Sequence, residues 1–166
     1  MAIEHTLVIL RHAKATEHVS EGGAFRDLDR PLAPRGLRDA QEAGRWLRDN
    51  LGELELVVCS PAVRAQQTWE SASTALGYAP ELREEDVLYA EPVEDLIDLI
   101  HELPAWMRTV AFVGHNPELS QLASALSGTE TELSTASIAV LDFEMPWTAV
   151  AEGAARLRAS VTARAH

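Results

Sequence analysis

Three mainly apolar runs, at residues 6–10, 54–59 and 109–114, constrain the fold of this chain more than any other feature. Each has the length of a strand and at most one polar residue, so each predicts a strand that is buried on both faces. Amphipathic helical patterns lie between or after these runs, at residues 34–50, 60–76, 92–102 and 116–126. Strands that alternate with helices predict an α/β protein, a three-layer α/β/α sandwich around a mostly parallel central sheet.

Two further strands are expected at residues 138–143 and 155–161, and a weak extended segment at residues 79–90. The 166 residues are enough for one domain, 1–166, with a core of ordinary size. No run is long enough to cross a bilayer, and the first residues do not resemble a secretory signal, so we expect a cytoplasmic protein. The single cysteine, Cys59, falls inside an apolar run and is expected to be a buried core residue.

The formal net charge is −12, which argues against a nucleic-acid partner, because nucleic acids are bound by clustered Lys and Arg on a basic face. Nothing in the sequence indicates a membrane partner. An acidic protein also repels anions at long range. Any phosphate site in this chain must therefore be a local concentration of positive charge.

Each buried run ends in side chains that suit an oxyanion. Arg11 and His12 follow the first run, Ser60 and then Arg64 follow the second, and His115 follows the third. The carboxyl ends of neighbouring parallel strands open at one edge of a sheet, so we expect these side chains to converge there. Two of the three ends lead into helix N-termini, which themselves favour anions. Each residue alone could be a solvated charge or a cap, but the repetition favours a phosphate site.

At these positions the sequence resembles the histidine phosphatase superfamily, which has the phosphoglycerate mutase-like fold. More narrowly, it resembles the small SixA-like phosphohistidine phosphatases. The similar motifs are Arg11-His-Ala-Lys-Ala15, Asp29-Arg-Pro-Leu32 followed by Arg35-Gly36, Ser60-Pro-x-x-Arg-Ala-x-x-Thr68, Leu88-Tyr89 and Val113-Gly-His-Asn-Pro117. One departure is Ala13, where the broader superfamily usually has Gly.

The resemblance implies that His12 is a nucleophile that becomes phosphorylated, while Arg11, Arg64 and His115 hold the phosphoryl oxygens. It implies a metal-independent hydrolase with no cofactor. An imidazole attacks phosphorus only when neutral, so one ring nitrogen of His12 must be free and the other held by a partner that the sequence does not identify. The sequence also lacks a closely spaced set of His and carboxylate residues of the kind that ligates zinc.

A general acid is harder to assign. Larger members of the superfamily use a Glu or Asp after the second helix, and this chain offers Glu84, Glu85, Asp86 and Glu91 there. No motif distinguishes any of them from surface charge. The imidazole of a phosphohistidine leaves more easily than an alkoxide, so protonation of the leaving group matters less for a phosphoramidate substrate.

The leading hypothesis is a phosphatase that acts through a covalent phosphohistidine on His12, with a phosphorylated protein as substrate and inorganic phosphate as product. One alternative keeps the chemistry but takes a small phosphate monoester as substrate. Another alternative is a non-catalytic phosphate-binding interaction module. A mutase is less favoured, because few additional basic residues are available to hold a second phosphate.

The loop at residues 15–33 is long and polar, which is typical of functional loops, and could cover the strand ends. Within and after it, Arg30 and Arg35 could reach the pocket rim or pair with Asp27, Asp29 and Asp39, and we favour pairing. Thr135 and Ser137 could add a hydroxyl at the same edge. The remaining histidines are expected to be exposed: His5, His18, His101 and His166.

Overall fold

A six-stranded sheet forms the centre of the molecule. The computed structural model describes residues 2–16 and 26–166. The strands are β1 (His5–Arg11), β2 (Leu56–Cys59), β3 (Glu81–Glu84), β4 (Thr109–Gly114), β5 (Ser137–Phe143) and β6 (Ala155–Thr162). Their spatial order is β3-β2-β4-β1-β5-β6. The pairs from β3 to β1 are all parallel, and β5 is antiparallel to both of its neighbours. The predicted mostly parallel sheet is confirmed.

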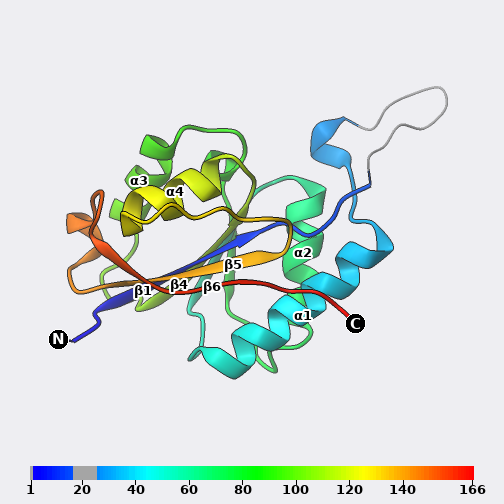
Figure 1. The fold of residues 1–166 in the computed structure, drawn as a ribbon, viewed down its shortest axis with the longest axis horizontal. Helices are drawn as coiled ribbons and strands as arrows, with labels where there is room; N and C mark the ends of the chain where they lie inside the picture. The colour runs from blue at the N-terminus through cyan, green and yellow to red at the C-terminus, as the bar shows by residue number, and fades with distance from the viewer. Residues whose placement is uncertain (1, 17–25) are drawn as a thin grey trace.

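Helices cover both faces of this sheet. They are α1 (Pro34–Asn50), α2 (Val63–Ser73), α3 (Val93–His101) and α4 (Glu118–Ser127), with short 3₁₀ turns η1 (Asp27–Asp29), η2 (Asp86–Leu88) and η3 (Trp147–Ala149). Figure 1 shows α1 and α2 on one side of the sheet and α3 and α4 on the other. The three-layer α/β/α sandwich is therefore confirmed.

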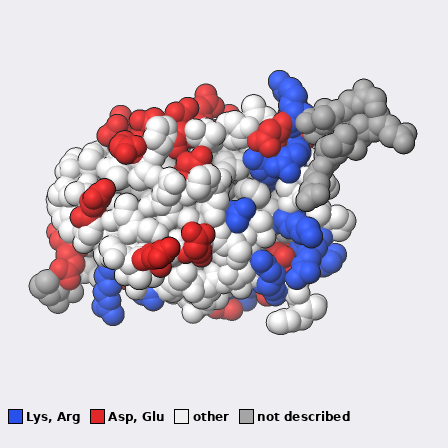
Figure 2. All heavy atoms as spheres, turned by 45° about the horizontal axis from the view of Figure 1, so that its top comes forward, with Lys and Arg blue, Asp and Glu red and all other residues white. Residues whose placement is uncertain are grey.

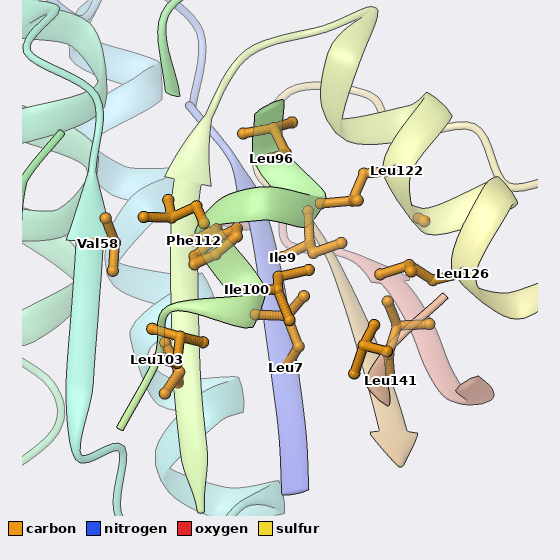
Figure 3. Close-up of a cluster of buried hydrophobic side chains, with 14 of the residues drawn as sticks. Leu7, Ile9, Val58, Leu96, Ile100, Leu103, Phe112, Leu122, Leu126 and Leu141 are labelled. Atoms are coloured by element: carbon orange, nitrogen blue, oxygen red, sulfur yellow. The ribbon is translucent and has the colours of Figure 1, made fainter. Parts of the chain in front are cut away.

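The middle residues of the central strands are apolar because both faces of these strands are buried. Leu7 and Ile9 of β1 pack with Phe112 of β4 in the core under α3 and α4 (Figure 3). The alternate residues Val8 and Leu10 belong to the core under α1 and α2. All five side chains have 0% of their surface exposed, as expected for strands whose side chains alternate between two covered faces.

Two helices begin later than the sequence suggested. Helix α2 starts at Val63 rather than at Ser60, and the Ser60 hydroxyl instead accepts a hydrogen bond from the Ala62 amide at 3.1 Å. Helix α4 starts at Glu118, while the side-chain oxygen of Asn116 accepts a hydrogen bond from the Ser120 amide at 3.1 Å. These side chains still satisfy amides near the helix N-termini, but they stand in the loops that precede the helices.

The expectation that the remaining histidines are exposed is wrong for His5, which is 5% exposed. Its ring stacks on Trp147 with centroids 4.3 Å apart, and its two nitrogens lie 3.1 Å from the carbonyl oxygens of Ala105 and Met145. His101 is half-buried and bonds to the Val150 carbonyl. His166 is exposed, and His18 lies outside the described residues.

Cys59 lies in the core as expected, and burial together with Glu84 raises the pKa of its thiol to about 12. A thiol with so high a pKa is a poor nucleophile.

None of the helices among residues 2–16 and 26–166 is long and apolar enough to cross a membrane.

Gly44 marks the closest approach of α1 to α2. A Cβ added there would lie 2.0 Å from the carbonyl oxygen of Ala72. The two helices can pack at their observed spacing only because residue 44 has no side chain.

We therefore expect Gly44→Ala to destabilise the fold by about 2 kcal/mol, because the helices must separate to admit the methyl group. The midpoint of thermal unfolding should fall by roughly 4–8 °C. The matched control is Gly52→Ala, since a Cβ at Gly52 meets nothing within 4 Å. Equal unfolding midpoints for the two variants would contradict this account of the α1–α2 contact.

Candidate active site

The register of the parallel strands brings the three polar strand ends to one level. Arg11 pairs with Gly114, and Cys59 pairs with Val113. The pairing continues past the strands, because the His12 amide donates to the Gly114 carbonyl at 2.9 Å and the Ser60 amide donates to the Val113 carbonyl at 3.0 Å. The edge of the sheet thus carries His12, Ser60 and His115 side by side. Arg11, His12, Arg64 and His115 are called the cage below.

His12 is held in one tautomer. Its Nδ1 lies 2.7 Å from the carbonyl oxygen of Ala13, and a carbonyl can only accept, so Nδ1 carries the proton. Nε2 then has a free lone pair. The imidazole is only 8% exposed. This carbonyl is the ring partner that the sequence did not identify.

His115 faces His12, with ring centroids 5.2 Å apart. Its Nε2 lies 2.7 Å from the Ser60 hydroxyl oxygen. The hydroxyl accepts a bond from the Ala62 amide and has one hydrogen to donate, so we assign His115 Nε2 as its acceptor and place the ring proton on Nδ1. His115 Nδ1 is buried and has no partner among the described residues. The ring therefore keeps one unused N–H donor.

The two arginines of the cage show the same pattern of used and unused donors. Arg11 donates through one terminal nitrogen to the Leu133 carbonyl at 3.0 Å. Arg64 donates through both terminal nitrogens to Asp27, at 2.6 Å to its carbonyl and 2.9 Å to Oδ2. In each arginine the Nε–H is buried without a partner in the described part of the chain. Buried N–H groups are normally hydrogen-bonded in proteins, and these two are suited to an anionic acceptor.

Burial and positive charge keep both imidazoles neutral. Burial is the main cause that lowers the pKa of His12 to about 4, and Arg64 and Arg11 add to it against the opposing bond to Ala13. Burial also lowers the pKa of His115 to about 3, with further contributions from His12 and Arg64. At neutral pH the cage therefore holds two charged guanidinium groups and two uncharged rings, an arrangement that attracts an anion and leaves His12 nucleophilic.

Asp27 and Tyr89 belong to this neighbourhood, and the sequence analysis did not place them there. The Tyr89 hydroxyl donates to Asp27 Oδ2 at 2.5 Å, and the Tyr89 ring meets the His115 ring edge-on at 5.4 Å. The hydrogen bond from Tyr89, followed by the bond and charge of Arg64, lowers the pKa of Asp27 to about 2. The only sequence signals were the proximity of Asp27 to Arg30 and the Leu88-Tyr89 motif.

Within the described residues, the four candidate general acids form no hydrogen bond or ion pair with the cage. Glu84 accepts a bond from Gln66 at 2.5 Å and lines a groove of about 570 Å³ beside Trp69. Glu85 is half-buried, and Asp86 and Glu91 are exposed. The carboxylate that does contact the cage is Asp27.

Other polar residues proposed for the rim have structural partners. Arg30 pairs with Asp27 at 3.1 Å, and Arg35 pairs with the buried Asp39 at 3.6 Å, as we favoured. Ser137 bonds to the Thr162 hydroxyl at 2.7 Å and so holds β5 to β6. The carbonyl of Thr135 accepts a bond from Arg164. The expectation about loop 15–33 concerns mostly residues 17–25, which lie outside the described residues.

Charge is unevenly spread over the surface. Figure 2 shows most of the Lys and Arg of this face toward the end of the molecule where η1 and the start of α1 lie, whereas Asp and Glu dominate the opposite end. The acidic chain thus concentrates positive charge on the side that carries Arg26, Arg30 and Arg35.

Among the described residues, no group of three or more His, Cys, Asp or Glu is placed to hold a metal ion.

Comparison with known proteins identifies the family. Residues 7–109 match the model of the histidine phosphatase superfamily (branch 1), and the chain belongs to this superfamily, so it is a phosphatase. A Mycobacterium tuberculosis protein that is itself uncharacterised is 38% identical over 159 residues, which cover 89% of this chain and 96% of the relative.

Solved structures agree with this assignment. A candidate phosphohistidine phosphatase, SixA, from Nakamurella multipartitia has 32% identity and a TM-score of 0.84, with 97% of each chain covered. The protein histidine phosphatase SixA in complex with tungstate has 22% identity and a TM-score of 0.81, with 95% of this chain and 96% of that one covered. At 22% identity, the similarity to the tungstate complex shows that the two proteins share a fold.

The neutral imidazoles predict a loss of stability on the acid side. An unfolded His takes up a proton below pH 6.5, whereas His12 and His115 resist protonation down to about pH 4 and 3. Their contribution is complete above pH 6.5 and is lost as the pH falls toward 4, by up to about 1.4 kcal/mol per pH unit for each ring. Urea unfolding between pH 4.5 and 8 measures this slope.

In that measurement His12→Gln and His115→Gln should each reduce the slope, and the exposed His166→Gln should leave it as in the wild type. The carboxylate of Asp27 does not interfere, because its own contribution is lost only between about pH 3.8 and 2. Identical slopes in wild type and both cage variants would contradict the assignment of buried neutral rings.

The unpartnered donors predict that phosphate or vanadate stabilises the fold in spite of the net negative charge. At a ligand concentration one hundred times Kd, mass action adds about 2.7 kcal/mol, or roughly 5–10 °C in the melting midpoint. Arg64→Gln should remove most of this shift, and Arg48→Gln at the far end of α1 should retain it. A wild-type melt that does not move at millimolar vanadate would contradict the cage as an anion site.

Proposed function

We propose that this protein removes the phosphoryl group from a phosphohistidine residue of another protein, through a covalent phosphohistidine on His12. One observation carries the proposal: a buried imidazole with a free Nε2 lies in a cage with three buried N–H groups that have no partner among the described residues, Arg11 Nε, Arg64 Nε and His115 Nδ1. This set provides a nucleophile and a receptor for the oxygens of one phosphoryl group. The similarity to a candidate phosphohistidine phosphatase at 32% identity supports the same substrate class.

In the first step, His12 Nε2 attacks phosphorus and the bond from phosphorus to the leaving group breaks. The Ala13 carbonyl holds the proton on Nδ1 and so stabilises the positive charge that the His12 ring gains. Arg11 and Arg64 present their remaining N–H donors to the phosphoryl oxygens, where charge develops during transfer. His115 adds its Nδ1–H.

In the second step, water attacks the phosphorus of phospho-His12, the bond to Nε2 breaks, and inorganic phosphate leaves. The ring keeps its Nδ1 proton and returns to its starting form. Approach of the dianion raises the tendency of His115 to bind a proton, because a negative charge opposes the desolvation that keeps the ring neutral.

In this mechanism the positive charge that a metal could supply comes from Arg11 and Arg64, and no cofactor takes part. The site requires only that the phosphoryl group reach the carboxyl edge of the sheet. The expectation of a cytoplasmic location and of a single domain over residues 1–166 is part of the same proposal.

The test is metal-free turnover, measured in the presence of a chelator, on a phosphohistidine-bearing protein and on 4-nitrophenyl phosphate in parallel. We expect the wild type to act much faster on phosphohistidine. His12→Ala should lose at least about 10³-fold in kcat on both substrates, because the nucleophile is removed. His166→Gln is the matched control and should behave as wild type.

Faster turnover of the aryl ester than of phosphohistidine would favour the small phosphate monoester as substrate. Full activity of His12→Ala would overturn the covalent mechanism, and a requirement for added metal would overturn metal independence. A protein that binds phosphate but turns over neither substrate would be the non-catalytic binding module.

A further inference from the structure

Asp27 lies between the cage and solvent. The cage side chain that it contacts, Arg64, is 6% exposed, whereas the Asp27 side chain is 50% exposed. A phosphoryl group held by the buried donors must direct its leaving group toward solvent. Asp27 is therefore a group on the solvent side of Arg64 that a leaving group can meet.

The carboxylate of Asp27 is fixed by three side chains. Arg64 of α2 and Tyr89, which follows η2, both donate to Oδ2, at 2.9 and 2.5 Å, and Arg30 donates to Oδ1 at 3.2 Å. A carboxylate can accept about four hydrogen bonds. A terminal nitrogen of Arg30 also lies 3.1 Å from Oδ1. In the described part of the chain Arg30 is thus the one side chain on Oδ1, which can accept from a second group on its exposed side.

Asp27 does not suit the role of general acid. Its neighbours hold the pKa of the carboxyl at about 2, Tyr89 being the largest cause. At neutral pH the group is ionised and has no proton to give. It can only accept, and an acceptor at the mouth of a phosphate site favours a leaving group that carries an N–H.

We propose that Asp27 selects phosphohistidine as the substrate, by accepting a hydrogen bond from the second ring nitrogen of the phosphorylated imidazole and so keeping that ring protonated. The proposal rests on the proposed function. It assigns to the same site a residue that recognises the leaving group rather than the phosphoryl group. Tyr89 is the positioning residue that holds the carboxylate in place.

The chemistry balances without an added acid. The substrate ring carries the phosphoryl group on one nitrogen and a proton on the other, next to Asp27. When His12 Nε2 bonds to phosphorus, the electron pair of the breaking P–N bond returns to the substrate nitrogen, and the ring leaves as neutral imidazole. His12 becomes the protonated phosphoimidazole. One P–N bond has been exchanged for another, and the proton on each ring stays where it was.

An ester gains nothing from this arrangement. An alkoxide or phenolate leaving group has no N–H to donate, and its developing negative charge is repelled by the nearby carboxylate. Asp27 thus favours the hydrolysis of phosphohistidine and disfavours the hydrolysis of esters. Both effects raise the ratio of phosphohistidine activity to ester activity.

The test compares Asp27→Asn with wild type on the phosphohistidine-bearing protein and on 4-nitrophenyl phosphate from pH 5 to 9. The ratio of kcat/KM for phosphohistidine to that for the ester should fall at least about tenfold. The alkaline limb of the phosphohistidine profile should move down by about one pH unit, because the substrate ring loses its proton more readily without the carboxylate. Tyr89→Phe should move both quantities in the same direction by less.

Asp29→Asn is the matched control: it makes the same change in the same turn, at a residue that pairs with Arg26 and not with the cage. It should keep the wild-type ratio and profile. An equal loss on both substrates in Asp27→Asn would overturn the proposal, since Asp27 would then only orient Arg64. An unchanged ratio would overturn it as well. Wild-type protein that turns over the ester alone would overturn the proposed function itself, which is a distinguishable result.

Discussion

The parallel pairing of β4 with β1 and β2 is the constraint on which the rest of the site depends. Backbone hydrogen bonds extend this pairing one residue beyond the strands, from His12 to Gly114 and from Ser60 to Val113. Each strand is apolar on both faces, so a slip of one residue would exchange the side chains between two different cores. The register is therefore fixed by burial along the whole strand. Core packing far from the site therefore determines that His12, Ser60 and His115 lie side by side at the edge of the sheet.

The second constraint is electrostatic. A chain with a net charge of −12 attracts a phosphate only where its positive groups are concentrated and poorly solvated. Arg11 and Arg64 are held in a buried cage by protein carbonyls and Asp27, with donors left over. Because both imidazoles are kept uncharged by burial and by these arginines, the site keeps a nucleophilic His12 at neutral pH. Burial thus has two effects: it strengthens the attraction of the cage for an anion, and it prevents protonation of the nucleophile His12.

The sequence predicted the strands and the cage residues because both depend on local signals. Uninterrupted apolar runs indicate strands buried on both faces, and residues at strand ends inherit their position from the sheet. Contacts between distant loops have no such signal. The bonds of Asp27 to Arg64 and Tyr89 cross 37 and 62 positions, and the Ser60–His115 bond crosses 55. His5 was misplaced for a related reason: its burial depends on Trp147 and on two distant carbonyls, none of which its own neighbours in the sequence reveal.

The ionised state of Asp27, the carboxylate that contacts the cage among the described residues, is informative about substrate chemistry. The carboxylate of Asp27 accepts hydrogen bonds from Arg64, Arg30 and Tyr89. These bonds favour its ionised form. Hydrolysis of an alkyl ester needs a proton delivered as the bond breaks. A fixed anion cannot deliver one, but it can retain a proton that the substrate brings. The cage provides two arginines and two neutral imidazoles, with an ionised carboxylate at its mouth. A substrate whose leaving group already carries a proton can react in such a site without a general acid from the protein.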